Sequence, residues 1–178
     1  MSRLADTTAY VALGANLGDP VTQVHRALDE LARMPQTRLA AASGLYVSKP
    51  VGFLDQPDYV NAVAALTTRL LPRALLDALL DLETRHGRSR DFKNAPRTLD
   101  LDLLLYGGRV MHEPGLTLPH PRMLERAFVL APLVEIAPDC AIPGHGTARE
   151  NLEKLEPLAL GTLTRLAAPE SLPRPAYS

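Results

Sequence analysis

The stretch "TLDLDLLLYGG" (Thr98–Gly108) places two carboxylates, Asp100 and Asp102, inside the most apolar strand-like segment of the chain. Alternate residues of a strand face the same way. One face is therefore expected to pack into the core, and it carries Leu99, Leu101, Leu103 and Leu105. Because burying an unpaired charge is very costly, the aspartate face requires water, a cation or basic side chains. The pattern predicts a strand over Leu99–Tyr106 with one packed face and one polar face.

Two amphipathic helices are predicted before this strand. The first begins at Asp19–Pro20, a favourable N-cap followed by proline at N1, and ends before Pro35. The second begins at Pro72 and has Gly87 as its C-cap. The residues expected to face inward are Val21, Val24, Leu28 and Leu31 in the first helix and Leu75, Leu76, Leu79 and Leu80 in the second.

Three more strands are predicted, over Ala9–Asn16, Arg38–Val47 and Tyr59–Thr68, with an irregular loop at Ser48–Asp58. Together with the aspartate strand they give the order β-α-β-β-α-β, the split βαβ pattern of ferredoxin-like folds. The sequence therefore predicts an α+β protein with a ferredoxin-like βαββαβ core. We expect an antiparallel sheet with both main helices on one face.

The chain continues past this core with C-terminal additions. Gly107–Gly108 is expected to form a hairpin turn into Arg109–His112, followed by a loop, a short helix from about Pro121 and an apolar stretch to Ile136. The length of 178 residues fits one domain, which we assign to residues 1–160. Residues 161–178, which end in "LPRPAYS", are expected to form a loosely held tail.

Composition excludes several classes of protein. The formal charge of −1 provides no overall basic field for coating nucleic acid. The single cysteine, Cys140, can form neither an internal disulfide nor a thiolate zinc cluster. No apolar run approaches the roughly 20 residues that cross a bilayer, and the first residues lack the apolar region of a signal peptide. We expect a cytoplasmic protein with neither nucleic acid nor membrane as a partner.

The segment before the aspartates is strongly basic. "RHGRSRDFKNAPR" (Arg85–Arg97) has Asp91 as its only acid. Two strand carboxylates can bind one hard cation, or two about 3.5–4 Å apart, and Mg²⁺ completes its shell with water and phosphate oxygens. Arginine grips phosphate oxygens with a planar fork. The pattern predicts a magnesium–polyphosphate site, and the alternative is a solvated strand face on which Arg97 and its neighbours pair with the aspartates.

"KNAPRTLDLDLLLYG" (Lys93–Gly107) resembles the signature of the 6-hydroxymethyl-7,8-dihydropterin pyrophosphokinase family of folate biosynthesis. Three further blocks resemble the same family in the same order: "YVALGANLGD", "PVGFLDQPDYVNAV" and "LPHPRMLERAFVLAPLVEIAPD". The resemblance implies a ferredoxin-like fold and transfer of a diphosphate from ATP to the pterin hydroxymethyl group, giving AMP. It also implies Mg²⁺, as two ions, ATP as co-substrate, and a monomer whose partners are small molecules.

The resemblance assigns roles to single residues of this sequence. Asp100 and Asp102 match the magnesium ligands, and with Arg88 and Arg97 they form the catalytic set. The residues matched to ATP binding are Glu83, Arg88, Arg90, Arg97, Leu103, Thr117, His120 and Arg126. Those matched to pterin binding are Ser48, Val51, Gly52, Tyr59, Asn61, Asp100 and Phe128.

Some of these residues also have simpler explanations. Tyr59 and Asn61 share a strand face, and an aromatic plane beside an amide suits a flat heterocycle with an amide-like edge. Alone, Tyr59 also fits an ordinary half-buried strand tyrosine. Alone, Phe128 fits a core residue, and His120 fits a helix-start residue that faces water. Only the joint pattern of blocks favours the binding roles.

Two other functions fit parts of the sequence. A ferredoxin-like RNA-binding module requires exposed aromatics and a basic sheet face, whereas the strands at 9–16 and 59–68 offer one tyrosine each. Another D-x-D nucleotide-dependent transferase would usually need a larger α/β domain. Two positions depart from the family pattern. Asn94 stands where many relatives carry an aromatic, and Leu80 where some carry a polar residue near the nucleotide.

Overall fold

An antiparallel sheet of six strands forms the centre of the computed structural model, which describes residues 5–50, 55–87, 99–155 and 157–167. The strand order is β10-β3-β4-β1-β5, and β2 also pairs with β4. The strands are β1 (Thr7–Ala15), β2 (Thr37–Ala42), β3 (Tyr46–Ser48), β4 (Tyr59–Thr68), β5 (Asp100–Tyr106) and β10 (Thr164–Arg165). The described residues do not include several positions discussed above, namely Val51, Gly52, Arg88, Arg90, Asn94 and Arg97.

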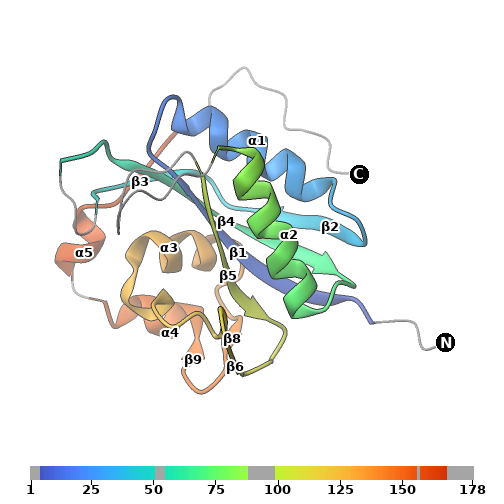
Figure 1. Ribbon diagram of the computed structural model, residues 1–178. Coiled ribbons are helices and arrows are strands. Elements are labelled where there is room, and N and C mark those ends of the chain that lie inside the picture. The colour runs from blue at the N-terminus through green and yellow to red at the C-terminus, as the bar shows by residue number, and fades with distance from the viewer. Residues whose placement is uncertain (1–4, 51–54, 88–98, 156, 168–178) are drawn as a thin grey trace.

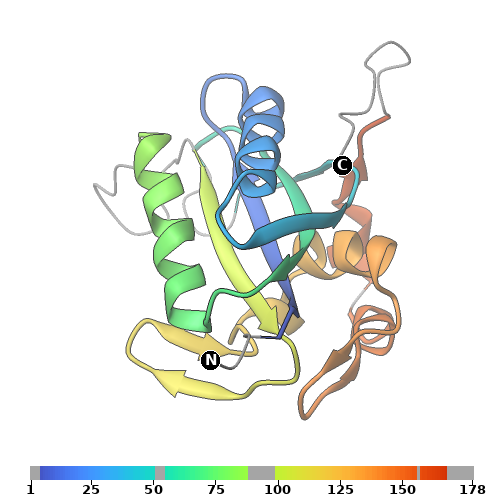
Figure 2. The same cartoon turned by 90° about the vertical axis from the view of Figure 1, so that its right-hand side faces the viewer.

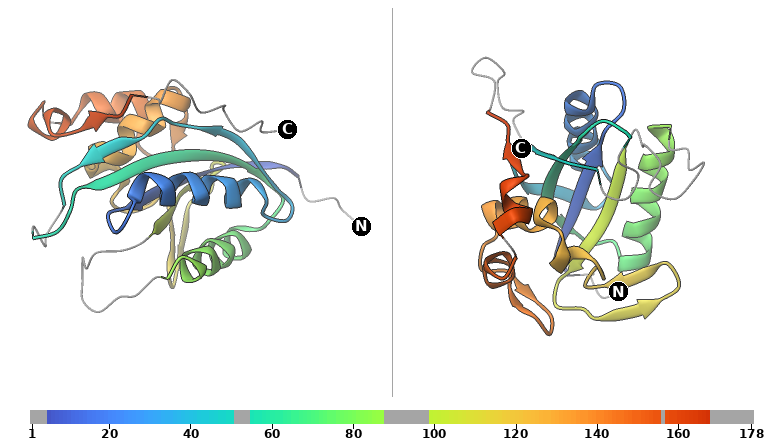
Figure 3. Two further views of the ribbon diagram at one scale, coloured as in Figure 1. Left: turned by 90° about the horizontal axis from the view of Figure 1, so that it is seen from above. Right: turned by 90° about the vertical axis from the view of Figure 1, so that its left-hand side faces the viewer.

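Helices cover both faces of this sheet (Figure 1; Figure 3). On one face lie α1 (Pro20–Ala32) and α2 (Pro72–Arg85); on the other lie α3 (Ala127–Ile136) and α4 (Ala148–Glu153). Because β4 is covered on both sides, every residue from Val60 to Leu66 is buried. The predicted α+β architecture, with both main helices on one face, is confirmed.

The apolar stripe of α2 differs from the prediction at one residue. Leu75, Leu79 and Leu82 are fully buried, whereas Leu80 is 39% exposed. The helical repeat continues from Leu79 to Leu82 and Glu83, so Leu80 falls at the edge of the stripe and faces solvent. The prediction that Leu80 points inward was wrong.

The predicted strand Arg38–Val47 is two strands, β2 and β3, which pair with different parts of β4. The break lies at Ser43, whose N–H donates to Val63 O (2.9 Å) while its Oγ accepts from Val63 N (2.9 Å). A side chain thus replaces one backbone partner of β4 and lets the edge bend. The sequence pattern alone does not reveal this side-chain hydrogen bond.

A β-bulge interrupts the pairing of β5 with β1. Tyr10 lies opposite Leu105 and Val11 opposite Leu103, which leaves Leu104 as the extra residue on β5. Leu105 therefore packs with Leu104 under α3, and the prediction that it shares a face with Leu103 was wrong. Past the bulge Tyr106 packs on the α1/α2 side.

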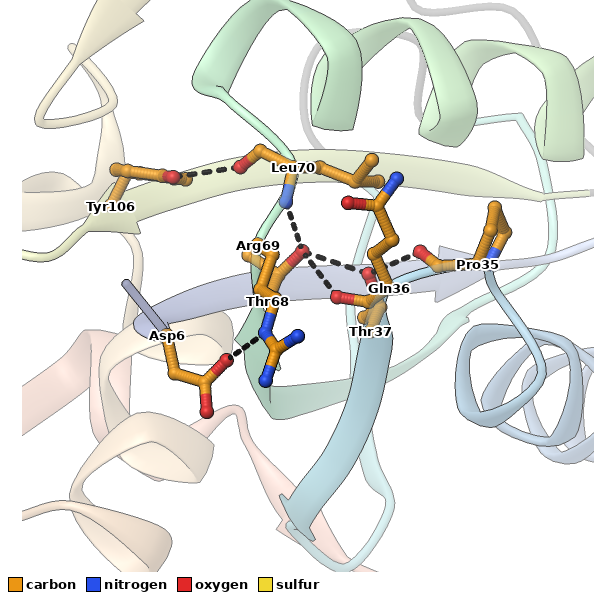
Figure 4. Close-up of polar contacts among 8 residues, drawn as sticks. All are labelled: Asp6, Pro35, Gln36, Thr37, Thr68, Arg69, Leu70 and Tyr106. Atoms are coloured by element: carbon orange, nitrogen blue, oxygen red, sulfur yellow. Dashed lines mark hydrogen bonds and ion pairs between the residues drawn. The ribbon is translucent and has the colours of Figure 1, made fainter. Parts of the chain in front are cut away.

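Tyr106 also links the end of β5 to the segment between β4 and α2. Its hydroxyl donates to Leu70 O at 2.7 Å (Figure 4). In the same region Thr68 Oγ1 accepts from Leu70 N (3.1 Å). The polar contacts in this corner hold the end of β4, the end of β5 and the beginning of α2 together.

The hairpin predicted between the aspartate strand and Arg109–His112 does not form. A turn is present at Gly107–Gly108, but β6 (Met111–Glu113) pairs with β7 (Leu116–Leu118) in a separate sheet (Figure 2). Pro114–Gly115 closes this hairpin, with Gly115 at φ +73°, which proline and glycine at the two central turn positions favour. The stronger turn signal lies seven residues later than the one that the sequence analysis used.

The remaining elements follow β7. The short helix expected from about Pro121 is a 3₁₀ turn at Met123–Glu125, and α3 follows it directly. Beyond α3 lie β8 (Ala141–Ile142), β9 (Gly146–Thr147), α4 and α5 (Pro157–Gly161). Strand β10 falls within the predicted tail and pairs with β3, so this part of the tail joins the sheet through backbone hydrogen bonds. Among the described residues, no helix has the length and apolarity needed to cross a bilayer.

Candidate active site

A cavity of about 410 Å³ lies on the α3 side of the sheet. Strands β1, β3, β4 and β5 contribute to its wall, as do the segment after β7 and the first turn of α3. The predicted site residues that it brings together are Ser48, Tyr59, Asn61, Asp100, Asp102, His120, Arg126 and Phe128. Residues separated by up to 80 positions in the sequence thus meet at one place.

A glycine creates room at the centre of this wall. Gly14 in β1 lies opposite Asn61 of β4 on one side and opposite Asp100 of β5 on the other. Directly opposed residues in antiparallel strands project from the same face, so the amide and the carboxylate flank a position without a side chain. A β-carbon at Gly14 would lie 3.4 Å from Asn61 Oδ1.

The amide of Asn61 is held in one orientation. Asn61 is buried, and its Nδ2 donates to Ser48 Oγ (2.8 Å) and to Tyr46 O (3.1 Å) in β3. With the nitrogen directed to β3, the amide oxygen lies on the Gly14 side. This oxygen can accept a hydrogen bond from an N–H group of a ligand in the cavity.

Asp100 lies across Gly14 from Asn61, and Asp102 follows two residues along β5, beside a histidine and an arginine. Asp102 Oδ1 is 3.9 Å from His120 Nε2, and Asp102 Oδ2 is 3.8 Å from Arg126 Nη1. Both aspartates line the cavity, as the alternation of β5 predicts. In the part of the chain that the structure describes, no cluster of three or more histidine, cysteine or acidic groups could hold a metal. A pair of carboxylates fits Mg²⁺, which takes few protein ligands and completes its shell with water and phosphate oxygens.

His120 is fixed by the backbone and kept neutral. The backbone N–H of His120 donates to the carbonyl of the bulge residue Leu104 (2.9 Å), and the ring Nδ1 accepts from Arg122 N (3.2 Å). Burial lowers the pKa of His120 to about 4, assisted by Arg126 and Arg122 and opposed by Asp100. The ring is therefore neutral at pH 7. Because Nδ1 accepts a hydrogen bond, Nε2 carries the proton and can donate to a ligand oxygen.

Arg126 and Phe128 form a stacked pair at the start of α3. The Cζ atom of Arg126 lies 5.6 Å from the centroid of the Phe128 ring, a cation–π distance. Both side chains line the cavity. The pair places a cation near Asp102 and an aromatic surface in the wall of the same cavity.

Three side chains predicted to bind ATP do not line the cavity. Glu83 is buried in α2, and its Oε1 accepts from Leu101 N (3.2 Å) beneath β5. The side chain of Leu103 lies on the α1/α2 face of the sheet and packs in the core there. Thr117 lies in β7 opposite His112. Their nucleotide roles stay predictions, and the contact of Glu83 shows how it supports the strand of the aspartates.

The cavity also contains residues that the sequence analysis did not assign. Gly14, Lys49, Pro121 and Arg122 line it, and Lys49 Nζ pairs with Asp58 (3.3 Å). Gly14 and Arg122 lie within blocks that the sequence analysis quoted. The register of β1 against both neighbours, which identifies Gly14, follows only from the folded sheet.

Residues 10–138 match the family model described as 7,8-dihydro-6-hydroxymethylpterin-pyrophosphokinase (HPPK). The chain belongs to the HPPK family. A Pseudomonas aeruginosa relative is 54% identical over 134 residues, 75% of this chain and 83% of the relative. A Haemophilus influenzae relative is 50% identical over 136 residues, 76% of this chain and 85% of the relative. Both are named 2-amino-4-hydroxy-6-hydroxymethyldihydropteridine pyrophosphokinase, and the predicted family is confirmed.

Two other similar proteins are longer chains. The Schizosaccharomyces pombe folic acid synthesis protein fol1 is 38% identical over 148 residues, 83% of this chain and 20% of fol1. A Plasmodium falciparum HPPK-DHPS triple mutant crystallised with pteroate superposes with a TM-score of 0.69 at 12% identity, over 90% of this chain and 46% of that one. The superposition shows the shared HPPK fold, and this chain spans less than half the length of that solved chain. Family membership identifies an ATP-dependent pyrophosphokinase of folate biosynthesis, and neither the RNA-binding nor the other transferase alternative is favoured.

Proposed function

We propose that the chain transfers a diphosphate group from ATP to the hydroxymethyl group of 6-hydroxymethyl-7,8-dihydropterin, and that it does so in the cavity on the α3 side of the sheet. The observation that carries this proposal is the joint placement of two strand carboxylates and a fixed amide in one cavity, with Gly14 between the amide and Asp100. The carboxylate end suits a metal-bound polyphosphate. The amide and aromatic end suits a flat heterocycle.

The pterin is assigned to the end of the cavity near Gly14. The oxygen of Asn61 accepts from an N–H of the ring, and the rings of Tyr59 and Phe128 supply apolar surface for its faces. The gap at Gly14 admits the edge of the heterocycle. Ser48 contributes indirectly, because its hydroxyl accepts the Asn61 amide hydrogen (2.8 Å).

The triphosphate is assigned to the end near the aspartates. Asp100 and Asp102 would hold Mg²⁺, for which we propose two ions. When bound, the metal neutralises phosphate charge and aligns the oxygens of the attacking and leaving groups. His120 donates from Nε2 as a neutral group, and Arg126 offers a guanidinium already oriented by Phe128. Fixed donors of this kind stabilise charge that develops in the transition state.

At the β-phosphorus the reaction forms one bond and breaks one, and the pterin hydroxyl releases its proton to solvent. The hydroxyl oxygen of the pterin bonds to the β-phosphorus of ATP, and the bond from that phosphorus to the oxygen bridging to the α-phosphate breaks, which releases AMP. Transfers of this type depend on positioning and charge stabilisation rather than on covalent catalysis. Arg88 and Arg97 are proposed to add positive charge at this step, as the family resemblance implies.

AMP formation tests the proposal. Purified protein with ATP, Mg²⁺ and the hydroxymethyl dihydropterin should release AMP and pterin diphosphate in equal amounts. Omission of the pterin should stop AMP release. Release of AMP without pterin, or of ADP with it, would contradict the proposal.

We also propose that the protein is a monomer, which size-exclusion chromatography with light scattering tests. We propose a cytoplasmic location, which fractionation of the source cells tests.

A further inference from the structure

A C-terminal strand lies against the edge of the sheet that supports the proposed pterin end. Strand β10 pairs with β3, with Thr164 opposite Val47 and Arg165 opposite Tyr46. Leu166 N donates to Leu45 O (2.8 Å) and extends the contact. These residues lie beyond the family match at residues 10–138. An element outside the matched region therefore pairs with the strand that orients Asn61.

One carboxylate joins this added strand to α3 and to the start of β3. Glu135, in the last turn of α3, accepts from Arg165 Nε (2.7 Å) and Tyr46 Oη (2.8 Å) on Oε1 and from Gly44 N (2.6 Å) on Oε2. The Arg165 guanidinium lies over Gly44, where a β-carbon would be only 2.6 Å from Arg165 Nη2. The absence of a side chain at Gly44 thus allows the close approach.

Both elements joined by Glu135 continue into the cavity. In β3, Tyr46 O and Ser48 Oγ accept the two hydrogen bonds that orient the Asn61 amide. In α3, Phe128 at the opposite end of the helix lines the cavity. The relative position of β3 and α3 therefore affects the separation of the Asn61 amide from the Phe128 ring.

We propose that Arg165 is a positioning residue for the pterin end of the cavity, acting through Glu135 to fix β3 against α3. This inference rests on the proposed function, because it concerns the binding of that substrate. Arg165 contacts no reacting atom. Its effect is to keep the Asn61 amide and the Phe128 ring at the spacing of a flat ring, while the backbone of β5, which carries the aspartates, is anchored through β1 and α2.

The test compares Arg165→Met with Arg165→Lys and with Arg149→Met. Arg149 is a matched control, since its side chain is also 54% exposed and also pairs with an acid, Asp139, at 3.5 Å, but away from β3. For Arg165→Met we expect KM for the pterin to rise about five- to twentyfold, within the range for displaced positioning groups. KM for ATP should change by less than about twofold, Arg165→Lys should recover most of the loss, and Arg149→Met should match the wild type.

A second measurement covers the case in which Arg165→Met does not fold. In ¹⁵N-labelled Arg165→Gln protein, the side-chain amide signal of Asn61 should shift, and it should not shift in Arg149→Met. Wild-type protein that makes no AMP would overturn the proposed function and this inference with it. If the wild-type protein is active, three results would overturn the inference alone. They are an unchanged KM for the pterin in Arg165→Met, equal rises in KM for both substrates, and an Asn61 amide signal that does not shift.

Discussion

Gly14 lies opposite Asn61 across the β1–β4 pair, and the position of its missing side chain is open to the cavity. A methyl group there would contact Asn61 Oδ1 at an ordinary 3.4 Å, so the free protein can accept Gly14→Ala. The same methyl would occupy the space proposed for the pterin edge. We expect pterin binding to weaken by about 1–3 kcal/mol, the usual cost of overpacking. Isothermal titration calorimetry measures this loss.

Gly108→Ala is the control for Gly14→Ala, since nothing lies within 4 Å of a β-carbon at Gly108. Its pterin affinity should equal that of the wild type. If Gly14→Ala binds pterin normally while folding normally, the ring does not lie against β1.

Replacement of either strand aspartate should abolish turnover and leave the fold intact. Loss of metal-borne charge stabilisation removes several kcal/mol of transition-state binding, so Asp100→Ala and Asp102→Ala should each lose about 1,000-fold or more in kcat/KM. Asp81→Ala is the control, because Asp81 forms an exposed pair with Arg85 (3.3 Å) on α2. Wild-type turnover by either strand variant at ordinary Mg²⁺ would exclude the proposed metal site.

Phe128→Ala should weaken the binding of the pterin much more than the binding of ATP. Loss of an aromatic stack costs on the order of 1–3 kcal/mol for a flat ring, and ATP has no assigned contact with this ring. Calorimetry should therefore show a large loss for pterin and a small one for ATP. A smaller loss for ATP is expected because Arg126, which stacks on Phe128 (5.6 Å), becomes less ordered. Equal losses for both ligands would move Phe128 out of the pterin end.

The contacts of Glu135 predict a dependence of stability on pH. Partial burial alone would raise the pKa of Glu135, but hydrogen bonds from Arg165, Gly44 and Tyr46 hold it below the ordinary 4.5. A carboxylate with a lowered pKa stabilises the fold fully above its unfolded value, and this contribution is lost as pH falls through the folded value. The Tm difference between wild type and Glu135→Gln should thus be largest near neutral pH and shrink below pH 4.5.

The control for this titration is Glu153→Gln, at an exposed position at the end of α4. Its Tm difference from wild type should stay small throughout. If the Tm difference between wild type and Glu135→Gln stays constant from neutral pH to about pH 3, the charge of the Glu135 carboxylate contributes nothing to stability.

Removal of residues 172–178 should leave activity unchanged. "LPRPAYS" is broken by prolines and lies beyond the family match. A chain ending at residue 162 should instead behave like Arg165→Met, because it also lacks β10. Steady-state assays of the two truncations check this contrast, and a tenfold fall on removing 172–178 alone would show that this segment contributes to the site.

Local patterns in the sequence predicted the elements that repeat regularly. β4 was placed at Tyr59–Thr68, as found, and Asp19 and Pro72 marked the starts of both main helices. The hairpin was misplaced because a local turn signal, Pro114–Gly115, was not used, whereas two other misplaced features depend on tertiary contacts. The division of the second strand depends on Ser43 bonding to Val63, and the face of Leu105 depends on an extra residue in the β5 register.

The same limit applies to the candidate site. Alternation alone placed both aspartates on one face of a strand, and their role as metal ligands was predicted from the basic segment before them and from the family resemblance. Gly14 could not be identified, since its importance follows from having Asn61 on one side and Asp100 on the other. The neutral state of His120 depends on burial and on Arg126, and neither can be inferred from a histidine between two prolines.

The extra residue at Leu104 makes β5 intolerant of changes in length. Upstream of it, Asp100 and Asp102 face the cavity; at the bulge itself, the Leu104 carbonyl receives the N–H of His120. A deletion of Leu104 would restore unbroken alternation and leave Tyr106 opposite Ala9 on the α1/α2 side. It would, however, withdraw the carbonyl that anchors His120. Homologous chains with this active site should therefore vary in side chain at this point of the strand far more readily than in residue number.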